Sequence, residues 1–447
     1  MYTGPLPIVS AAAFATDWYV DANNGNDGWD GTTAAIPSQE VIDQCTAQGV
    51  PVPGPRKTLH AMMSDERVQP GDVVKAAEGD YNEGGDVSGS NVTSNRVQVK
   101  AGVMLLATGS RDATFITGSG GSGDAAYNTG AVRCVYFIAP PDKAAYGYGI
   151  VKRFTLRNGR TASTSEHGGA SVGNGLLVEC VLSGNGCRDG SRAGGMNNGT
   201  ALRCKIGAAS KGYALYYRTK AIDSLFSSSG GSYSSCIAYN CTFTGDSYLR
   251  NCISYNCLYI GTGAASGSQA VNGKDQSKHY NTFSRSAFHA TACVTNETCR
   301  IVTADDSPYN PTTYRPLAGS AVIDASDMSY YEAATNGWKA AWLAECGKDY
   351  YGNDRAVNGA IDVGCGEAQN GSLLTVNDVS DGLDVTGANK GESYLAEGTS
   401  AKLTFSRNFT SDQLCTGVNV DGVFHSFGGT TGDVPYSVTI PAVFATD

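Results

Sequence analysis

The strongest constraint on the fold of this chain is an internal repeat. Residues 235–241 and 251–257 read SCIAYNC and NCISYNC, which are near duplicates. Similar short strands precede them, separated by Gly, Ser and Asn turns, and their cysteines align in a column. This column contains Cys180, Cys204, Ser224, Cys236 and Cys252, at broadly similar intervals along the chain. Repetition of one small unit in this way indicates a solenoid.

In a parallel β-solenoid each coil lies on the coil before it, so equivalent side chains form columns. We therefore expect the aligned cysteines to form an interior ladder of small apolar side chains, because cysteine is among the most buried residue types. A metal or redox role has little support, since no histidine stands at ligand spacing. The interval from Ser224 to Cys236 is the shortest in the column and is short for a full coil, so the alignment of that coil stays open.

The composition agrees with an all-β fold and excludes several other classes. Glycine accounts for 57 of 447 residues and only 17% of the residues are charged, which argues against a coiled coil or a charge-driven disordered chain. No run of about 18 apolar residues occurs, so we expect no membrane span. The net charge of −10 repels phosphate backbones, which argues against a nucleic-acid partner.

The chain is predicted to have three parts. Residues 1–16 are interpreted as a signal-peptide remnant or an N-terminal extension, because Ala13-Phe14-Ala15 matches a cleavage site after a short apolar stretch. The first of these interpretations predicts a secreted or cell-surface protein. Residues 17–370 are predicted to form the solenoid, with a short amphipathic helix at 58–65 as its N-terminal cap. Residues 371–447 alternate apolar and polar positions, which predicts a small Ig-like β-sandwich.

Three groups of motifs carry a resemblance to a known superfamily. They are YVDANNGNDGWDG with QPGDVVKAAEGDYNEG near the start, RFTLRNGRT in the middle, and RPLAGSAVIDASD with DYYGNDRAVNGAIDVGCGE towards the end. Over about residues 18–368 the chain resembles the right-handed parallel β-helix (pectate-lyase-like) superfamily of secreted carbohydrate-active proteins. The resemblance implies a right-handed parallel β-helix. It leaves the activity open, because this architecture hosts lyases, hydrolases, epimerases and non-catalytic adhesins.

The favoured activity is a polysaccharide lyase that cleaves an acidic, uronate-containing glycan by β-elimination. The resemblance implies a Lys or Arg that removes the proton beside the uronate carboxylate, and calcium or another cation that neutralises that carboxylate. The segment SKGYALYYRTKAID places bases among tyrosines, which suits a stacked, negatively charged sugar. The predicted catalytic residues are Lys211 as base, Arg218 as carboxylate partner, Tyr217 as stacking group or proton donor, and His167 as reserve proton shuttle. The predicted substrate-binding residues are Tyr213, Tyr216, Lys220 and Arg188.

Other interpretations remain open. The same segment also fits a solvated strand end whose tyrosines fill a surface groove. A glycoside hydrolase would need two carboxylates across one bond, drawn from Glu179, Asp189, Asp223 and Asp246. However, Glu179, Arg203 and Asp223 each precede a residue of the cysteine column, which favours an outward ladder of alternating charge. A non-catalytic extracellular solenoid, such as an adhesin, fibre subunit or glycan-binding surface protein, fits the Gly/Ser/Asn-rich coils.

Three further groups have predicted roles. The loop DANNGNDGWDG offers oxygen ligands at short spacing, which predicts a structural calcium site at Asp21, Asn26, Asp27 and Asp30; Asx turns without metal are the alternative. The charged residues of the last motifs are expected to lock the final coils by buried ion pairs and capped turns rather than to catalyse; they are Asp324, Asp354, Arg355, Asp362 and Glu367. Cys293 and Cys299 are candidates for a disulfide.

Overall fold

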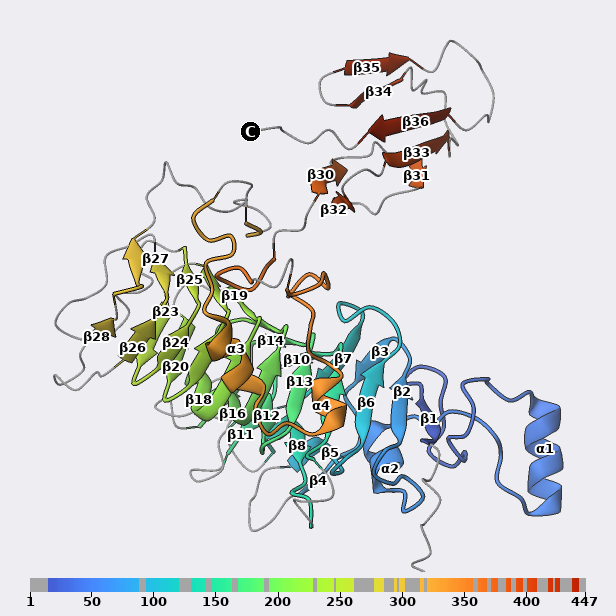
Figure 1. Cartoon of the computed structure of the whole chain (residues 1–447). Helices are drawn as coiled ribbons and strands as arrows, with labels where there is room; N and C mark the ends of the chain where they lie inside the picture. The colour runs from blue at the N-terminus through green and yellow to red at the C-terminus, as the bar shows by residue number, and fades with distance from the viewer. Residues whose placement is uncertain are drawn as a thin grey trace, which may run out of the picture. The chain divides into compact units, whose positions relative to one another are not determined.

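A computed structural model describes most of the chain. The described residues are 15–87, 94–119, 130–141, 147–162, 168–188, 193–227, 231–244, 247–260, 277–284, 293–295, 297–301, 314–316, 320–356 and 361–367, together with seven strands further on. The chain divides into two compact units, Met1–Glu367 and Ala368–Asp447. Figure 1 shows the helices and strands of both units.

The first unit contains four helices and 29 strands among the described residues. The helices are α1 (Gln39–Gln48), α2 (Leu59–Ser64), α3 (Met328–Thr335) and α4 (Ala340–Leu343). The strands are β1 (Asp17–Val20), β2 (Val73–Ala76), β3 (Gly79–Tyr81), β4 (Asp86–Val87), β5 (Ser94–Val99), β6 (Met104–Ala107), β7 (Thr114–Thr117), β8 (Val132–Phe137), β9 (Ile150–Lys152), β10 (Thr155–Arg157), β11 (Arg160–Thr161), β12 (Ser171–Val172), β13 (Leu176–Val178), β14 (Val181–Ser183), β15 (Gly186–Cys187), β16 (Ala193–Leu202), β17 (Lys205–Ile206), β18 (Tyr213–Ile222), β19 (Leu225–Ser227), β20 (Gly231–Ser234), β21 (Ile237–Tyr239), β22 (Thr242–Thr244), β23 (Ser247–Arg250), β24 (Ile253–Tyr255), β25 (Leu258–Tyr259), β26 (Ser277–Tyr280), β27 (Phe283–Ser284), β28 (Cys293–Thr295) and β29 (Arg300–Ile301).

Most of these strands lie in two long sheets, one of 17 strands and one of 10 strands. The order in the smaller sheet is β29-β27-β25-β22-β19-β17-β14-β10-β7-β3, so neighbours in space are one coil apart in the sequence. Its pairs are parallel, as in the register of Thr155 with Val181. In the larger sheet β4 and β5 pair antiparallel, whereas the coil-to-coil pairs are parallel. The architecture is a parallel β-solenoid, as the repeats predict.

From β9 to β27, the described coils pass from the larger to the smaller sheet through one residue in the left-handed backbone region. Seven such residues have φ between 45° and 65°: Arg153, Glu179, Arg203, Asp223, Asn240, Asn256 and Asn281. The last three form a ladder, because the Asn256 side-chain amide donates to Asn240 Oδ1 (3.3 Å) and that of Asn281 donates to Asn256 Oδ1 (2.8 Å). Asparagine tolerates this conformation better than most residues. The sequence analysis missed the ladder.

The cysteine column follows these left-handed residues, and it differs from the predicted one. The registers of Lys205 with Leu225 and of Thr242 with Leu258 define it. Its members are Cys180, Cys204, Ser224, Cys241, Cys257 and Thr282, all buried. The prediction was correct up to Ser224 and wrong for Cys236 and Cys252, which follow a second bend in the coil and contact each other (Sγ–Sγ 3.3 Å). The interval from Ser224 to Cys236 is short because the two residues follow different bends. Ser224 follows the bend at Asp223, whereas Cys236 follows the bend at Ser235.

The interior of the coils is a continuous apolar core. It includes a stack of the rings of Phe226, Phe243 and Tyr259, whose centroids are 4.1 and 4.4 Å apart. At the N-terminal end, α2 buries Leu59 and Met62 in the same core. The predicted helix is therefore confirmed, while its role as a cap stays a prediction.

A segment near the end of the first unit covers part of the solenoid. This closing segment comprises the described residues 320–356 and 361–367 and contains α3 and α4. Ala334 of α3 packs with Leu202, Ile222 and Tyr239 on the outer face of the larger sheet, and Figure 1 shows α3 and α4 in front of the green strands. This part of the sheet is therefore not an open surface.

The second unit contains seven described strands, which pair antiparallel. They are β30 (Gly371–Val376), β31 (Leu383–Thr386), β32 (Gly391–Ala396), β33 (Ser400–Arg407), β34 (Gly417–Val420), β35 (Val423–Ser426) and β36 (Tyr436–Pro441). The all-β prediction is confirmed here, and the Ig-like sandwich stays a prediction. Within the described part of the chain, no helix has the length and apolar character needed to cross a bilayer.

Candidate functional site: an exposed aromatic and basic ridge

The larger sheet bends within each coil, and one of these bends carries exposed aromatic and basic side chains. In β18 the bend lies at Tyr217 and Arg218, with φ of 44° and 56°. The Tyr217 side chain is 44% exposed, which makes it one of the few large hydrophobic residues on the described surface. We call Tyr216, Tyr217 and Arg218 the ridge.

The ridge is held together by stacking. The Tyr213 and Tyr216 rings stack with centroids 5.6 Å apart, and the Tyr216 and Tyr217 centroids are 6.3 Å apart. The Arg218 guanidinium lies 5.1 Å from the centre of the Tyr217 ring, a cation–π contact. The Arg218 backbone N–H donates to Ser235 O of the next coil (2.9 Å). Four of the predicted site residues are thus brought together, but the prediction that Tyr213 is exposed to a substrate was wrong, because its side chain is buried beneath the stack.

The bend does not require tyrosine or arginine. The preceding coil has Asn198 and Gly199 at this place, and the following coils have Ser235 and Asn251, all with positive φ. These small or polar residues tolerate the left-handed region, whereas a large side chain there costs about 1–2 kcal/mol. Two consecutive costly residues, both exposed, therefore indicate a role other than folding.

The other predicted basic residues are not part of the ridge. Lys211 precedes β18 and forms a β-bridge with Gly186. The extended chain from Lys211 to Tyr217 is about 20 Å long. Lys220 is half-buried between Thr200 and Ile237 of the adjacent coils. Arg188 is exposed at the end of β15. His167, Asp189 and Asp246 lie outside the described residues.

The oxygens of the N-terminal loop accept hydrogen bonds from nearby donors. Asp21 Oδ1 accepts from the N–H groups of Asn23 and Asn24 (2.8 and 3.0 Å). Asn26 Oδ1 accepts from Gly28, Asp27 accepts from Lys57 and Thr58, and Asp30 accepts from Thr32. These contacts are Asx turns and loop ties. Calcium at Asp21, Asn26, Asp27 and Asp30 stays a prediction.

The charged column Glu179, Arg203 and Asp223 is covered rather than outward. Arg203 Nη2 lies 2.9 Å from Glu179 Oε1, so part of the expected ladder exists. However, Arg203 is 2% and Asp223 0% exposed, because the closing segment packs on them and contributes Glu345. The predicted ladder of alternating charge exists in part, but the expectation that it lies at the surface was wrong for Arg203 and Asp223. Asp223 is inaccessible to a polysaccharide, which removes it from the hydrolase candidates.

Arg355 is the centre of the buried ionic cluster under the closing segment. Its Nε lies 3.0 Å from Asp223 Oδ1 and its Nη1 lies 3.2 Å from Glu367 Oε2. The guanidinium also donates to the carbonyl oxygens of Asp362 and Gly364 (2.9 and 2.8 Å). The predicted buried ion pairs therefore exist for Arg355 and Glu367, but the pair that reaches the solenoid joins Asp223, between β18 and β19, rather than the final coils, and Asp354 pairs with Lys348 at the surface.

Burial changes the acidity of this cluster. It raises the pKa of Asp223 to about 7 although Arg355 and Arg203 act in the opposite direction, and Asp349 adds to the increase. Burial likewise raises the pKa of Glu367 to about 9, again against Arg355. The pKa of the Arg355 guanidinium is raised by the carboxylates around it, so it stays charged.

A pH dependence of stability follows for Asp223. The unfolded chain loses this proton near pH 4, whereas the folded chain keeps it up to about pH 7. The free energy of unfolding therefore falls as the pH rises through this window, because the folded state binds more protons there. Urea unfolding at pH 4, 5.5 and 7 measures this effect. In Asp223→Asn, the free energy of unfolding should fall less steeply with rising pH than it does in the wild type. Equal slopes for the variant and the wild type would contradict this assignment.

The comparisons with known proteins give little further information. No family model matches the chain, and no curated protein matches it. A structural likeness exists to the crystal structure of pectate lyase Pel9A, at 12% sequence identity and a TM-score of 0.33, covering 80% of this chain and 97% of the other. This TM-score is too low to support a conclusion about fold or activity. The parallel β-solenoid is defined here by its own strand pairing.

Proposed function

We propose that this protein is an extracellular β-solenoid that binds an acidic polysaccharide across the ridge. The observation that carries the proposal is the exposed, stacked Tyr217–Arg218 pair at a bend where neighbouring coils have Gly, Asn or Ser. A tyrosine ring offers an apolar face to a sugar ring and a hydroxyl to its polar edge. A guanidinium pairs with a carboxylate such as that of a uronate.

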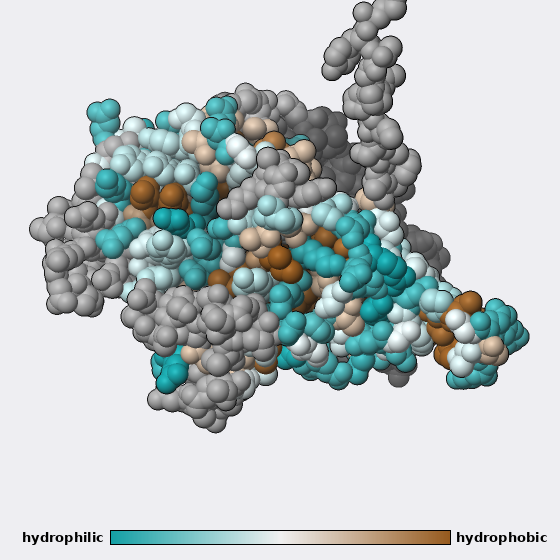
Figure 2. Space-filling model, turned by 90° about the horizontal axis from the view of Figure 1, so that it is seen from below, coloured by the Kyte–Doolittle hydropathy of each residue, from teal (hydrophilic) through white to brown (hydrophobic). Residues whose placement is uncertain are grey.

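The surroundings of the ridge favour an extended polymer. Asn198 of the preceding coil and Ser235 and Asn251 of the following coils lie at the equivalent bends and are at least partly exposed, so uncharged hydrogen-bonding groups flank the ridge along the solenoid axis. Figure 2 shows one face of the molecule, on which hydrophobic residues form only small, separate patches. Polar groups in line with one aromatic ridge fit a chain of sugars better than they fit an apolar protein partner.

We favour polysaccharide binding over β-elimination as the function of the ridge. The predicted base Lys211 is about 20 Å from Tyr217 along β18, so the backbone does not place it beside the ridge. The lyase activity with Lys211, Arg218, Tyr217 and His167 stays a prediction. It is tested by following ultraviolet absorbance, which reports the new double bond, in the binding mixtures. An absorbance rise that is lost in Lys211→Ala would establish elimination.

The proposal predicts a salt-sensitive affinity that depends on Arg218. Calorimetric titration with uronate-containing oligosaccharides should show binding that weakens as salt rises, because salt screens the attraction between the exposed Arg218 guanidinium and the ligand carboxylate. In Arg218→Ala we expect about tenfold weaker binding, equivalent to about 1.4 kcal/mol, and a smaller salt dependence.

Arg300→Ala is the matched control. Arg300 is also exposed and also lies over an aromatic ring, but its partner Phe283 is buried and offers no surface for a sugar. This variant should bind as the wild type does. Absence of binding across a broad panel of acidic glycans, or equal losses in both variants, would refute the proposal.

A further inference from the structure

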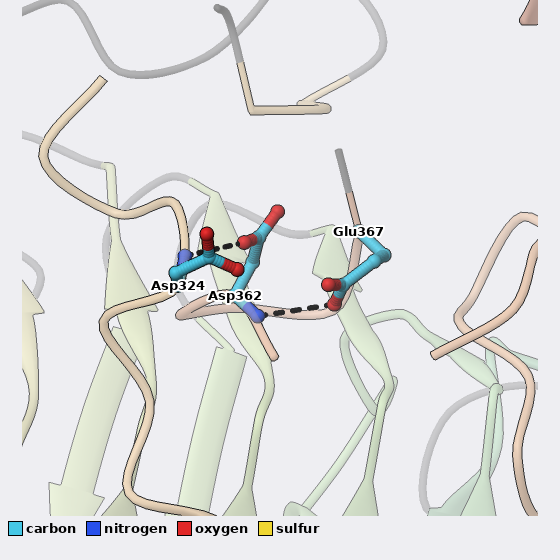
Figure 3. A group of neighbouring side chains, drawn as sticks. All are labelled: Asp324, Asp362 and Glu367. Carbon is cyan, nitrogen blue, oxygen red and sulfur yellow. Dashed lines mark hydrogen bonds between the residues drawn. The ribbon is translucent and has the colours of Figure 1, made fainter. Parts of the chain in front are cut away.

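We propose that Asp324, Asp362 and Glu367 of the closing segment bind a calcium ion. One carboxylate oxygen from each residue lies within 4.8 Å of the others, and Figure 3 shows the three side chains around a common space. We call them the carboxylate triad. The site is separate from the ridge and from the N-terminal loop, and it does not depend on the proposed function.

The backbone holds the triad together. Asp324 has a left-handed backbone with φ of 52°, and its N–H donates to Asp362 Oδ1 (2.8 Å). The Asp362 N–H donates in turn to Glu367 Oε2 (3.0 Å). Three carboxyl groups are therefore held close together by backbone hydrogen bonds. Figure 3 shows the Glu367 carboxylate turned toward the two aspartates.

An unsatisfied oxygen is the independent sign of a ligand. Glu367 is 0% exposed, and its Oε2 contacts Arg355 Nη1 and the Asp362 N–H. Its Oε1 is buried and has no hydrogen-bond partner among the described residues. Leaving such an oxygen unpaired is unfavourable, and more so when the group is charged. A cation beside Oε1 would remove this cost.

The donor set and the dimensions favour a divalent cation, and calcium in particular. The triad offers three carboxyl groups, and the adjacent Arg355 is shared with Asp223; a bound cation would hold these groups in the ionised form that burial alone disfavours for Glu367. Calcium takes six to eight oxygens at about 2.3–2.6 Å in flexible geometry, which permits ligand oxygens up to about 5 Å apart. Magnesium requires about 2.0–2.1 Å and near-octahedral order. Asp324 is exposed, so water can complete the coordination.

Calcium at this position would fasten two distant parts of the closing segment. Asp324 precedes α3, whereas Asp362 and Glu367 come after α4. The loop between these last two residues lies on the asparagine ladder, since the Gly364 N–H donates to Asn256 O (2.9 Å). The ion would therefore hold the closing segment at the level of the later coils.

The test is calcium titration of the full chain after removal of metals with a chelator. Calorimetry should show a calcium site, and the midpoint of thermal unfolding should rise with calcium, because a ligand that binds only the folded state stabilises it. In Asp324→Asn we expect at least about tenfold weaker binding at this site. Asp324 is exposed, so the substitution leaves the buried ion pairs intact. Asp354→Asn, an exposed carboxylate of the same segment outside the triad, should bind calcium as the wild type does.

Two results would overturn the proposal. The first is a wild-type protein whose unfolding midpoint and titration heat do not respond to calcium. The second is an Asp324→Asn variant that binds calcium as tightly as the wild type, which would place the ion elsewhere, as in the N-terminal loop. Glu367→Gln tests whether the buried carboxylate itself is a ligand. Calcium binding should be lost in this variant, and its unfolding midpoint should no longer rise with calcium.

Discussion

Replacing Arg355 with alanine is expected to lower the free energy of unfolding of the solenoid unit by about 3–5 kcal/mol. Arg355 is 1% exposed and is ion-paired with Asp223 and Glu367. Its loss would leave both carboxylates buried without their cation, and the carbonyl oxygens of Asp362 and Gly364 would lose their donor. Removing one partner of a buried charge pair is far more costly than removing a surface charge.

The loss of unfolding free energy in Arg355→Ala is measured by urea unfolding, monitored by circular dichroism, with Lys348→Ala as the control. Lys348 also forms an ion pair in the closing segment, with Asp354 at 2.6 Å, but both side chains are at least half exposed. Its loss should therefore change the free energy of unfolding by less than about 1 kcal/mol. Comparable losses in the two variants would show that the Arg355 cluster does not stabilise the fold in the way described.

Replacing Tyr217 with glycine is expected to weaken polysaccharide binding by at least about tenfold without reducing stability. The variant loses the exposed ring over which Arg218 lies. It also relieves the left-handed strain at Tyr217, where φ is 44°, because glycine adopts this region without a steric penalty. Affinity and stability should therefore respond in different directions, which is characteristic of a strained residue retained for function.

Tyr217→Phe and calorimetric titration complete this test. Phenylalanine keeps the aromatic face, so this variant should retain most of the affinity, whereas Tyr217→Gly should not. A large stability loss in Tyr217→Gly would mean that the ring supports the fold. Unchanged binding in the same variant would mean that the ridge is not the binding surface.

The solenoid was predictable from the sequence because its evidence is local and repeated. Small residues recur after each bend, so the alignment of Cys180, Cys204 and Ser224 predicted from the sequence is correct. The error at Cys236 arose because every coil has two bends with similar small residues after them. A periodic pattern identifies the repeat, but it does not distinguish two equivalent positions within one repeat.

The site was less predictable because its residues meet only through the fold. The proximity of Tyr213, Tyr216 and Tyr217 was predictable, since one short segment contains all three, but their stacking on one another was not predicted. The burial of Asp223 was not foreseen, because Arg355, its ion-pair partner, comes from the closing segment, far away in the sequence. Nothing in the local pattern around Asp223 indicates that a distant segment returns to cover it.

The closing segment also changes how this solenoid is expected to unfold. A stack of coils that touch only their neighbours frays from its ends, because its stability is a sum of nearest-neighbour terms. Here one segment crosses several coils: Glu345 pairs with Lys152 (2.7 Å), and the amides of Asn256 and Asn281 donate to Asp327 O and Ala325 O (2.9 and 2.7 Å). A coil cannot detach without breaking contacts that also hold coils further along. The segment thus couples otherwise independent coils into one cooperative unit.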